Sequence, residues 1–278
     1  MENKKNGGMI FMNKKILFAL IVVGLLAVSA VSAQNSLFLS NNNDDSMYQV
    51  SLMQAFMHGE YDGVITVGDF KSHGDIGLGT FEGVNGEMIV LDGVVYQAAA
   101  DGSINVMSDD EKIPFGTITN FDEDGKIDNI TAKDFDDLTS QLDKEITKYG
   151  TNNMYIIKIK GDFSKITVRS VEKQEKPYKE FTEVAAVDQK VFNHTEQTGT
   201  IVAVYFPDYM NELNMHGWHL HFLSDDKTKG GHVLNLTDFN GSGQVDEIHE
   251  FNMILPTDDS FAKMNFTEDM TNKINSVE

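Results

Sequence analysis

Residues 87–107, EMIVLDGVVYQAAADGSINVM, contain three β-prone runs separated by two Asp-Gly pairs. The runs cover Glu87 to Leu91, Val94 to Ala98 and Ser103 to Met107. Asp92-Gly93 and Asp101-Gly102 stand between them, and Asp-Gly favours the positive φ angles of tight hairpin turns. The stretch therefore predicts a β-meander.

Two helices are expected on either side of this meander. Upstream, apolar residues fall on one face of a helix over Met47 to Met57. Downstream, a helix is predicted over Ala132 to Lys148, with Thr131 as its cap and Asp134 near its positive N-terminal end. Its apolar stripe consists of Phe135, Leu138, Leu142 and Ile146.

The remaining β-prone runs complete the predicted fold. Met154 to Ile159 and Ile166 to Val171 flank a bend at Gly161-Asp162. After Pro177, further strands are expected over Thr200 to Phe206, Trp218 to Leu223, His232 to Leu236 and Val245 to Leu255. We therefore predict an α+β fold of mixed β-sheets with a few helices and two strand-rich halves. The expected boundary separates an N-terminal α+β domain, residues 47–175, from a β-rich C-terminal domain, residues 176–278.

The N-terminus has the pattern of a secretory leader. Lys14 and Lys15 precede an apolar run from Ile16 to about Ala30, and small residues follow at Val31-Ser32-Ala33. The run is shorter than the roughly 20 residues that span a bilayer comfortably, which favours a signal peptide over residues 1–33, cleaved after Ala33. A retained N-terminal anchor stays open, as does translation from Met12. Residues 34–46 are expected to form a polar linker.

Composition restricts the partners of the exported chain. The formal net charge is −21, and removal of residues 1–33, which hold four Lys and one Glu, brings it to −24. This charge disfavours nucleic acid and anionic lipid, so we expect no nucleic-acid partner and no stable membrane contact after leader removal. A small anionic substrate would need a local positive centre. The chain has no cysteine, so a zinc site would use His and carboxylate ligands.

Three histidines have a spacing suited to one metal ion. His219 and His221 alternate with apolar residues, so in a strand their imidazoles share one face, about 6 to 7 Å apart by Cα. His232 follows the turn-forming segment 227–231 and can return on a neighbouring strand. Three neutral imidazoles leave zinc an open position, as in catalytic sites. The alternative is a solvent-facing strand whose histidines merely alternate with core residues.

The other histidines and the acidic turns give weaker indications. His216 and His249 fit the strand geometry less well and are interpreted as surface residues, and His58, His73 and His194 stand alone. The acidic turns 108–111 and 121–125 lack the full twelve-position ligand pattern of a calcium loop, so they are interpreted as solvated loops.

Several separated motifs, in order from about Ser46 to the C-terminus, resemble the alpha-acetolactate decarboxylase family. They are GDIGLGTF at 74–81, NGEMIVLDG at 85–93 followed by Tyr96-Gln97 and Asp101-Gly102, RSV at 169–171 with QEKPY at 174–178, GTIV at 199–202, GWHLHF at 217–222 and GGHV at 230–233. The resemblance supports zinc ligation by His219, His221 and His232, which makes the C-terminal half the zinc-binding one, with the site on its strands.

The resemblance also implies three further active-site residues. They are a carboxylate at Glu87, an arginine at Arg169 and a tail glutamate, which aligns best with Glu278. Thr80 is a weaker candidate for the substrate pocket. Trp218 replaces the family's usual tyrosine, and the leader departs from an activity more familiar as cytoplasmic. The family further suggests a homodimer.

The implied reaction converts (S)-2-acetolactate to (R)-acetoin and CO2. Loss of CO2 leaves an enediolate, which zinc can stabilise as a Lewis acid without an organic cofactor. Arg169 would hold the carboxylate or the developing enediolate, while Glu87 and Glu278 are candidates for proton delivery or zinc ligation. Two other classes stay open: a His₃-zinc hydrolase or other lyase, and an exported protein that binds metal or a small ligand without turnover.

Overall fold

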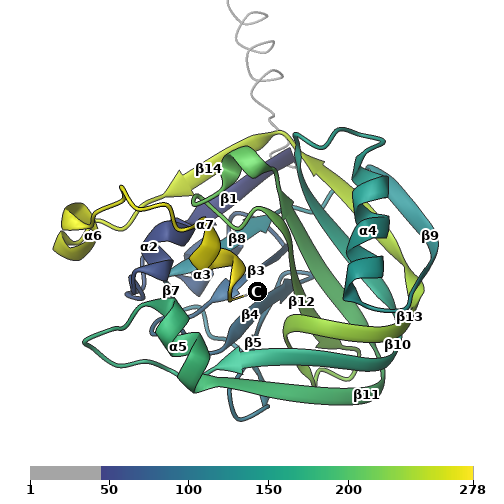
Figure 1. The fold of residues 1–278 in the computed structure, drawn as a ribbon, viewed down its shortest axis with the longest axis horizontal. Coiled ribbons are helices and arrows are strands. Elements are labelled where there is room, and N and C mark those ends of the chain that lie inside the picture. Colours follow the sequence, from purple (N-terminus) through teal and green to yellow (C-terminus); the bar gives the residue numbers. More distant parts are fainter. Residues whose placement is uncertain (1–44, 278) are drawn as a thin grey trace, which may run out of the picture. The chain divides into compact units, whose positions relative to one another are not determined.

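The computed structural model describes residues 45–277, and Asp44–Glu278 form one compact unit. Two large sheets dominate it, with few helices (Figure 1), as the α+β prediction required. The predicted leader, residues 1–33, and Glu278 lie outside the described residues, as does nearly all of the predicted linker. Ser46, placed at the end of that linker, already begins the first strand.

The larger sheet has seven strands in the order β14-β1-β8-β3-β4-β5-β6. All neighbours are antiparallel except β1 and β14, which are parallel. The strands are β1 (Ser46–Val50), β3 (Ile76–Thr80), β4 (Glu87–Leu91), β5 (Val94–Ala98), β6 (Ile104–Val106), β8 (Phe115–Thr119) and β14 (Glu250–Ile254). A separate pair joins β2 (Ile65–Thr66) and β7 (Lys112–Ile113).

The predicted meander is confirmed as β4, β5 and β6. Asp92 and Gly93 both have positive φ, at 50° and 75°, which is the conformation expected of a tight two-residue hairpin turn.

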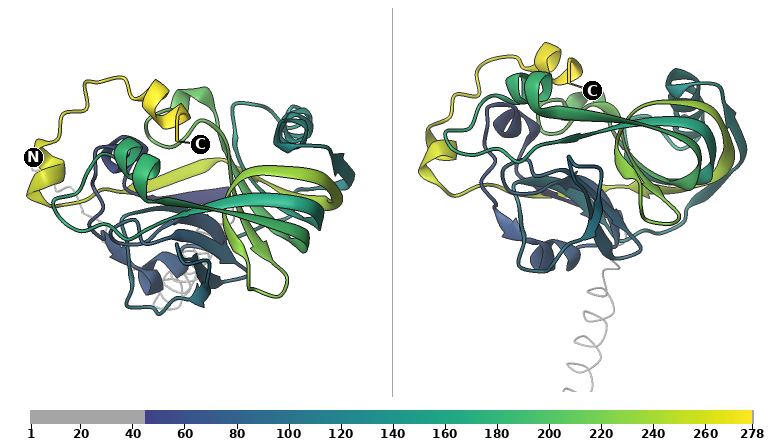
Figure 2. Two further views of the ribbon diagram at one scale, coloured as in Figure 1. Left: turned by 60° about the horizontal axis from the view of Figure 1, so that its bottom comes forward. Right: turned by 90° about the horizontal axis from the view of Figure 1, so that it is seen from below.

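The second sheet has five strands in the order β10-β11-β12-β13-β9. Because β10 also pairs with β13, the strands β10 to β13 close into a ring of pairings, visible in the right-hand view of Figure 2. Its strands are β9 (Gly125–Ala132), β10 (Met154–Val171), β11 (Gln189–Phe206), β12 (Gly217–Ser224) and β13 (Gly230–Ile248).

These strands are longer than the sequence predicts. Gly161 does not interrupt β10; it lies opposite Gly199 of β11 and Gly241 of β13. A Cβ added at Gly161 would lie 2.3 Å from the Asn240 carbonyl oxygen, so these glycines allow three backbones to pass close together. The predicted division after residue 175 falls in the connection between β10 and β11, which pair along most of their length.

The helices are short apart from one. They are α2 (Met53–Met57), α3 (Val67–Lys71), α4 (Phe135–Ile146), α5 (Phe181–Asp188), α6 (Asp259–Lys263) and α7 (Thr271–Asn275), with a 3₁₀ turn, η2 (Asp208–Met210). Within the part of the chain that the structure describes, no helix is both long and apolar enough to cross a bilayer.

The predicted helix over Met47 to Met57 is wrong in its first half. Ser46–Val50 is strand β1, buried on both faces between β14 and β8, and only Met53–Met57 is helical. A strand buried on both faces lacks the alternation of polar and apolar residues that distinguishes it from a helix in sequence. Ser51, with φ of 61°, separates the two elements.

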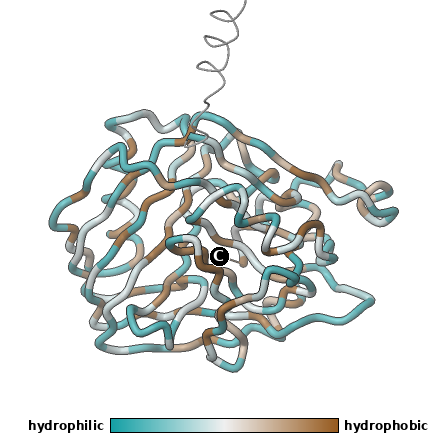
Figure 3. Tube along the Cα trace, turned by 180° about the vertical axis from the view of Figure 1, so that it is seen from behind, coloured by the Kyte–Doolittle hydropathy of each residue, from teal (hydrophilic) through white to brown (hydrophobic). Residues whose placement is uncertain are grey.

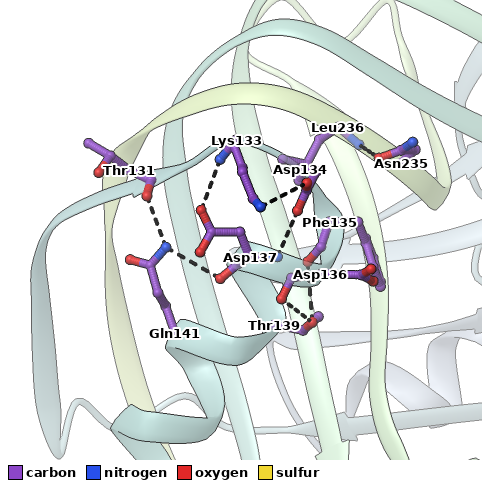
Figure 4. A network of polar contacts seen from close by, with 10 residues as sticks. All are labelled: Thr131, Lys133, Asp134, Phe135, Asp136, Asp137, Thr139, Gln141, Asn235 and Leu236. Atoms are coloured by element: carbon purple, nitrogen blue, oxygen red, sulfur yellow. Dashed lines mark hydrogen bonds and ion pairs between the residues drawn. The ribbon is translucent and has the colours of Figure 1, made fainter.

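The predicted second helix is confirmed as α4, but its cap is Asp134 rather than Thr131. The Asp134 side chain accepts a hydrogen bond from the Asp137 backbone N–H at 2.9 Å (Figure 4). Thr131 belongs to β9, and its carbonyl accepts a hydrogen bond from the Gln141 side chain. The helix buries Leu138, Leu142 and Ile146 against the five-stranded sheet.

A buried apolar cluster joins the two sheets. It brings Met47, Ile76 and Ile89 of the larger sheet together with Ile156 and Val202 of the smaller one. Hydrophobic residues recur along the central strands, while the peripheral loops are largely hydrophilic (Figure 3). The sheets are thus held face to face by the hydrophobic effect, and residues at their common border keep fixed positions.

Asp246 of β13 is an exception in this interior. It is fully buried, and one carboxyl oxygen, Oδ2, accepts a hydrogen bond from the Asp122 backbone N–H at 3.2 Å. Burial, followed by the charges of Asp124, Asp45 and Asp122, raises the pKa of Asp246 to about 8 against the lowering effect of that hydrogen bond.

This shift predicts a pH-dependent stability. Because the folded state favours the protonated acid, the free energy of unfolding should fall as pH rises from about 4 to about 8, by on the order of a few kcal/mol. Asp246→Asn should remove that part of the pH dependence in urea unfolding at pH 5 and pH 8.5. The exposed control Asp110→Asn should behave like the wild type. Equal pH dependence in the wild type and Asp246→Asn would contradict the prediction.

Candidate metal centre

Three imidazoles converge at the hairpin of β12 and β13. His219 and His221 alternate along β12, and His221 lies directly opposite His232 of β13. All three offer a donor atom within 4.8 Å of the others, and the Nε2 atoms of His219 and His221 lie 3.1 Å apart. The strand spacing and the returning hairpin predicted from sequence are therefore present in the structure.

Gly231 places His232 at this point. It has φ of 142°, and a Cβ there would lie 2.4 Å from the Arg169 carbonyl oxygen. A side chain at this position would thus separate β13 from β10. Their close approach lets His232 lie opposite Arg169, so the histidines and the arginine share one region.

The orientation of the His221 ring is fixed from the other sheet. Its Nδ1 lies 2.7 Å from the carbonyl oxygen of Met88, in β4. Since a carbonyl only accepts hydrogen bonds, Nδ1 carries the proton and Nε2 presents its lone pair. This is the usual arrangement of a metal-binding histidine, whose second nitrogen donates to a carbonyl or carboxylate.

Burial keeps the imidazoles of His221 and His232 neutral. His221 is fully buried, while His232 and His219 are 2% and 8% exposed. Burial lowers the pKa of His221 well below its ordinary value, and His232 and Arg169 lower it further against the opposing hydrogen bond to Met88. Burial and then Arg169 likewise lower the pKa of His232. These two imidazoles therefore keep lone pairs available at neutral pH.

The donor set fits a zinc ion. Two nitrogens at zinc–nitrogen distances of 2.0–2.1 Å in a tetrahedron lie about 3.3 Å apart, close to the separation of the His219 and His221 Nε2 atoms. Within residues 45–277 this is the one group of three or more His, Asp or Glu residues whose donor atoms converge in this way. Three protein ligands, with a further position for water or substrate, are typical of a catalytic zinc site.

Glu87 and Arg169, which the resemblance implies as active-site residues, lie beside the histidines. Glu87 begins β4, with Oε2 at 3.5 Å from His221 Nε2 and Oε1 at 3.8 Å from Arg169 Nε. Arg169, in β10, is 3% exposed. Its Nη1 donates to the Gln189 side-chain oxygen at 3.2 Å and to the Val277 carbonyl oxygen.

These groups border a cavity with an empty volume of about 430 Å³, including its opening to solvent. Thr80 reaches the cavity, but its hydroxyl donates to the Gly86 carbonyl oxygen at 2.7 Å, so only its lone pairs remain for a ligand. The lining residues are Met53, Phe56, Gly79, Thr80, Val84, Glu87, Phe115, Arg169, Phe181, His219 and Val277.

Sequence reasoning missed the apolar wall of the cavity and Gln189. The wall draws on α2, β8, α5 and the C-terminal segment, and nothing in a single sequence distinguishes these apolar residues from ordinary core residues. Glu278 lies outside the described residues, although its neighbour Val277 lines the cavity. Trp218 does not line the cavity, because its ring packs against Tyr205 and its N–H donates to Asp143 of α4.

The remaining histidines stay apart from the centre. His73 stacks on Tyr48, His194 of β11 stacks on Phe192, His58 lies 3.7 Å from Glu180, and His216 and His249 approach Asp208 and Glu247. None of these five belongs to the converging group of His219, His221 and His232.

An α+β fold that encloses three buried imidazoles, an arginine and a glutamate beside a cavity defines a site able to bind a metal ion and a small anion. A model of the alpha-acetolactate decarboxylase family matches residues 47–268. Among curated proteins, alpha-acetolactate decarboxylase from Methanosarcina mazei is 37% identical over 240 residues, covering 86% of this chain and 82% of that protein. That from Brevibacillus brevis is 36% identical over 232 residues, covering 84% and 80%.

Solved structures agree. The crystal structure of alpha-acetolactate decarboxylase from Bacillus subtilis strain 168 superimposes with a TM-score of 0.79 at 30% identity, covering 84% of this chain and 99% of that one. A Staphylococcus aureus protein described as similar to alpha-acetolactate decarboxylase gives the same TM-score at 27% identity, covering 84% and 100%. This chain belongs to the alpha-acetolactate decarboxylase family.

The site predicts metal content that depends on His221. His221→Ala removes one of three donors together with its hydrogen bond to Met88, so most of the tightly bound metal should be lost. Metal per chain, measured by mass spectrometry after desalting, checks this. His249→Ala, an exposed control, should retain the wild-type content. Equal metal in the two variants would place the ion elsewhere.

Proposed function

We propose that this chain decarboxylates (S)-2-acetolactate to (R)-acetoin and CO2 in a zinc-dependent reaction. The observation that carries the proposal is the convergence of His219, His221 and His232 beside Arg169 and Glu87. His219, Arg169 and Glu87 also line one cavity. Membership of the alpha-acetolactate decarboxylase family supports the substrate and the reaction.

The three histidines would hold the metal. Bound zinc would supply a Lewis acid that draws electron density from the substrate's ketone and hydroxyl oxygens, which favours loss of CO2. The chain's own contribution is three imidazole nitrogens, of which His221 Nε2 is directed by the hydrogen bond that Nδ1 donates to the Met88 carbonyl.

Arg169 is suited to binding the substrate carboxylate. It places a permanent positive charge in a buried cavity of a chain whose formal net charge is −21. An anion repelled by the outer surface therefore finds one local positive centre. The planar guanidinium offers several N–H groups in a fixed geometry, which favours a carboxylate over a neutral ligand.

Glu87 is suited to proton delivery. After CO2 leaves, the carbon that carried it must receive a proton on one face for the product to have one handedness. Glu87 borders the cavity, with its two oxygens directed toward His221 and Arg169. Its 3.5 Å approach to His221 Nε2 also leaves it within reach of a metal at that nitrogen, so ligation and proton delivery are both compatible with its position.

Export and assembly are proposed on other grounds. The lysines at 14 and 15, the apolar run after them and the small residues at 31–33 support a secretory leader. The homodimer is supported by the family resemblance.

The reaction gives a direct test with two variants. The purified protein should convert racemic acetolactate to acetoin, an outcome that a zinc hydrolase or a non-catalytic binder would not give. Glu87→Gln should lower turnover far more than zinc content if Glu87 delivers a proton, whereas a loss of zinc would identify it as a ligand. Arg169→Lys should keep zinc while kcat/KM falls, by about 1.5 to 3 kcal/mol in transition-state stabilisation. Absence of acetoin from the zinc-loaded wild type would reject the proposal.

Glu278 is tested by substitution rather than by deletion. Deletion would alter the backbone next to the Val277 carbonyl, which accepts a hydrogen bond from Arg169. Glu278→Gln avoids this change. If Glu278 delivers the proton, the variant should bind zinc normally yet turn over slowly or give racemic acetoin, as measured by chiral gas chromatography. Unchanged rate and stereochemistry would leave Glu87 as the proton donor.

A further inference from the structure

We propose that Gln189 is a positioning residue, which holds the Arg169 guanidinium by a hydrogen bond in the orientation that binds the substrate carboxylate. The proposal rests on the decarboxylase function above and extends it to a residue outside the family motifs quoted from the sequence.

The strand register brings Gln189 to Arg169. In the antiparallel pair β10–β11, Arg169 lies opposite Val191 and Gln189 lies opposite Val171. Arg169 and Gln189 are therefore diagonal neighbours on one face of the sheet, a spacing that long side chains can bridge. The side-chain oxygen of Gln189 accepts from Arg169 Nη1 at 3.2 Å.

Both ends of α5 contribute to the same arginine. Phe181 begins the helix, and its ring lies 5.7 Å from the guanidinium carbon of Arg169. Gln189 follows the last residue of the helix and begins β11. The helix thus holds the Phe181 ring and the Gln189 side-chain oxygen beside the same guanidinium. Because both residues belong to the ends of one helix, the helix sets the distance between them.

The neutrality of Gln189 matters as much as its oxygen. A guanidinium that is 3% exposed needs acceptors for its N–H groups. The Val277 carbonyl and the Gln189 amide are neutral acceptors, while Glu87 Oε1 lies 3.8 Å from Nε. A second carboxylate at position 189 would pair with the arginine and compete with an anionic substrate. A residue without an acceptor would remove one of the groups that orient Nη1.

Two substitutions separate these effects. Gln189→Met keeps the length of the side chain but removes the amide oxygen, so kcat/KM for acetolactate should fall about tenfold, the scale of one hydrogen bond to a charged group. Gln189→Glu keeps an acceptor but adds a negative charge, so KM should rise while zinc content stays normal. Gln197→Met is the matched control: Gln197 lies on the same strand, and its amide contacts only the backbone of Thr195 and Glu196.

A double-mutant cycle tests whether Gln189 acts through Arg169. In an Arg169→Lys background, Gln189→Met should lower kcat/KM less than about twofold, because the guanidinium that Gln189 orients is absent. A tenfold loss of kcat/KM in both backgrounds, or a wild-type kcat/KM in Gln189→Met, would overturn the proposal. Thermal unfolding of each variant distinguishes loss of folding from loss of positioning. Failure of the wild type itself to form acetoin would instead reject the decarboxylase function.

Discussion

The hydrogen bond between the His221 imidazole and the Met88 carbonyl is the contact on which the site depends. It crosses from β12 of one sheet to β4 of the other, so it can form only when the two sheets pack in their correct register. Its chemical effect is to put the proton on Nδ1 and leave Nε2 as a donor. Its position also matters, because Glu87 precedes Met88 in β4. The contact that sets the imidazole tautomer therefore lies next to the proposed proton donor.

The net negative charge of the chain contrasts with the positive charge of Arg169 in its site. A chain with net charge −21 encloses a cavity lined by the buried Arg169 and by His219. Arg169 itself helps to lower the pKa of His221 and His232, so the group suited to binding an anion also keeps the metal-binding nitrogens deprotonated. Removing the arginine would thus change both functions. The carboxylate of Glu87 lies near both Arg169 and His221, and its negative charge limits the free-energy cost of burying the positive charge of Arg169.

The sequence predicted the parts of the site that depend on local spacing. His219, His221 and His232 lie within one hairpin, so the alternation of a strand and one turn suffice to bring them together. The Asp92-Gly93 turn and the apolar stripe of α4 are local in the same way. Glu87 and Arg169 follow only from the family resemblance, because no periodicity relates a residue in β4 to one in β10.

What the sequence did not predict depends on contacts between distant segments. Strand β1 is wrongly predicted as a helix because its partners, β8 and β14, lie far along the chain, and a strand buried on both faces has no alternating pattern. The continuity of β10 through Gly161 depends on glycines at the facing positions of β11 and β13. The position of the Arg169 side chain also depends on distant segments. Its Nη1 donates to Gln189 at the start of β11 and to Val277 in the C-terminal segment. The geometry of this side chain therefore follows from tertiary contacts and not from the residues around it in sequence.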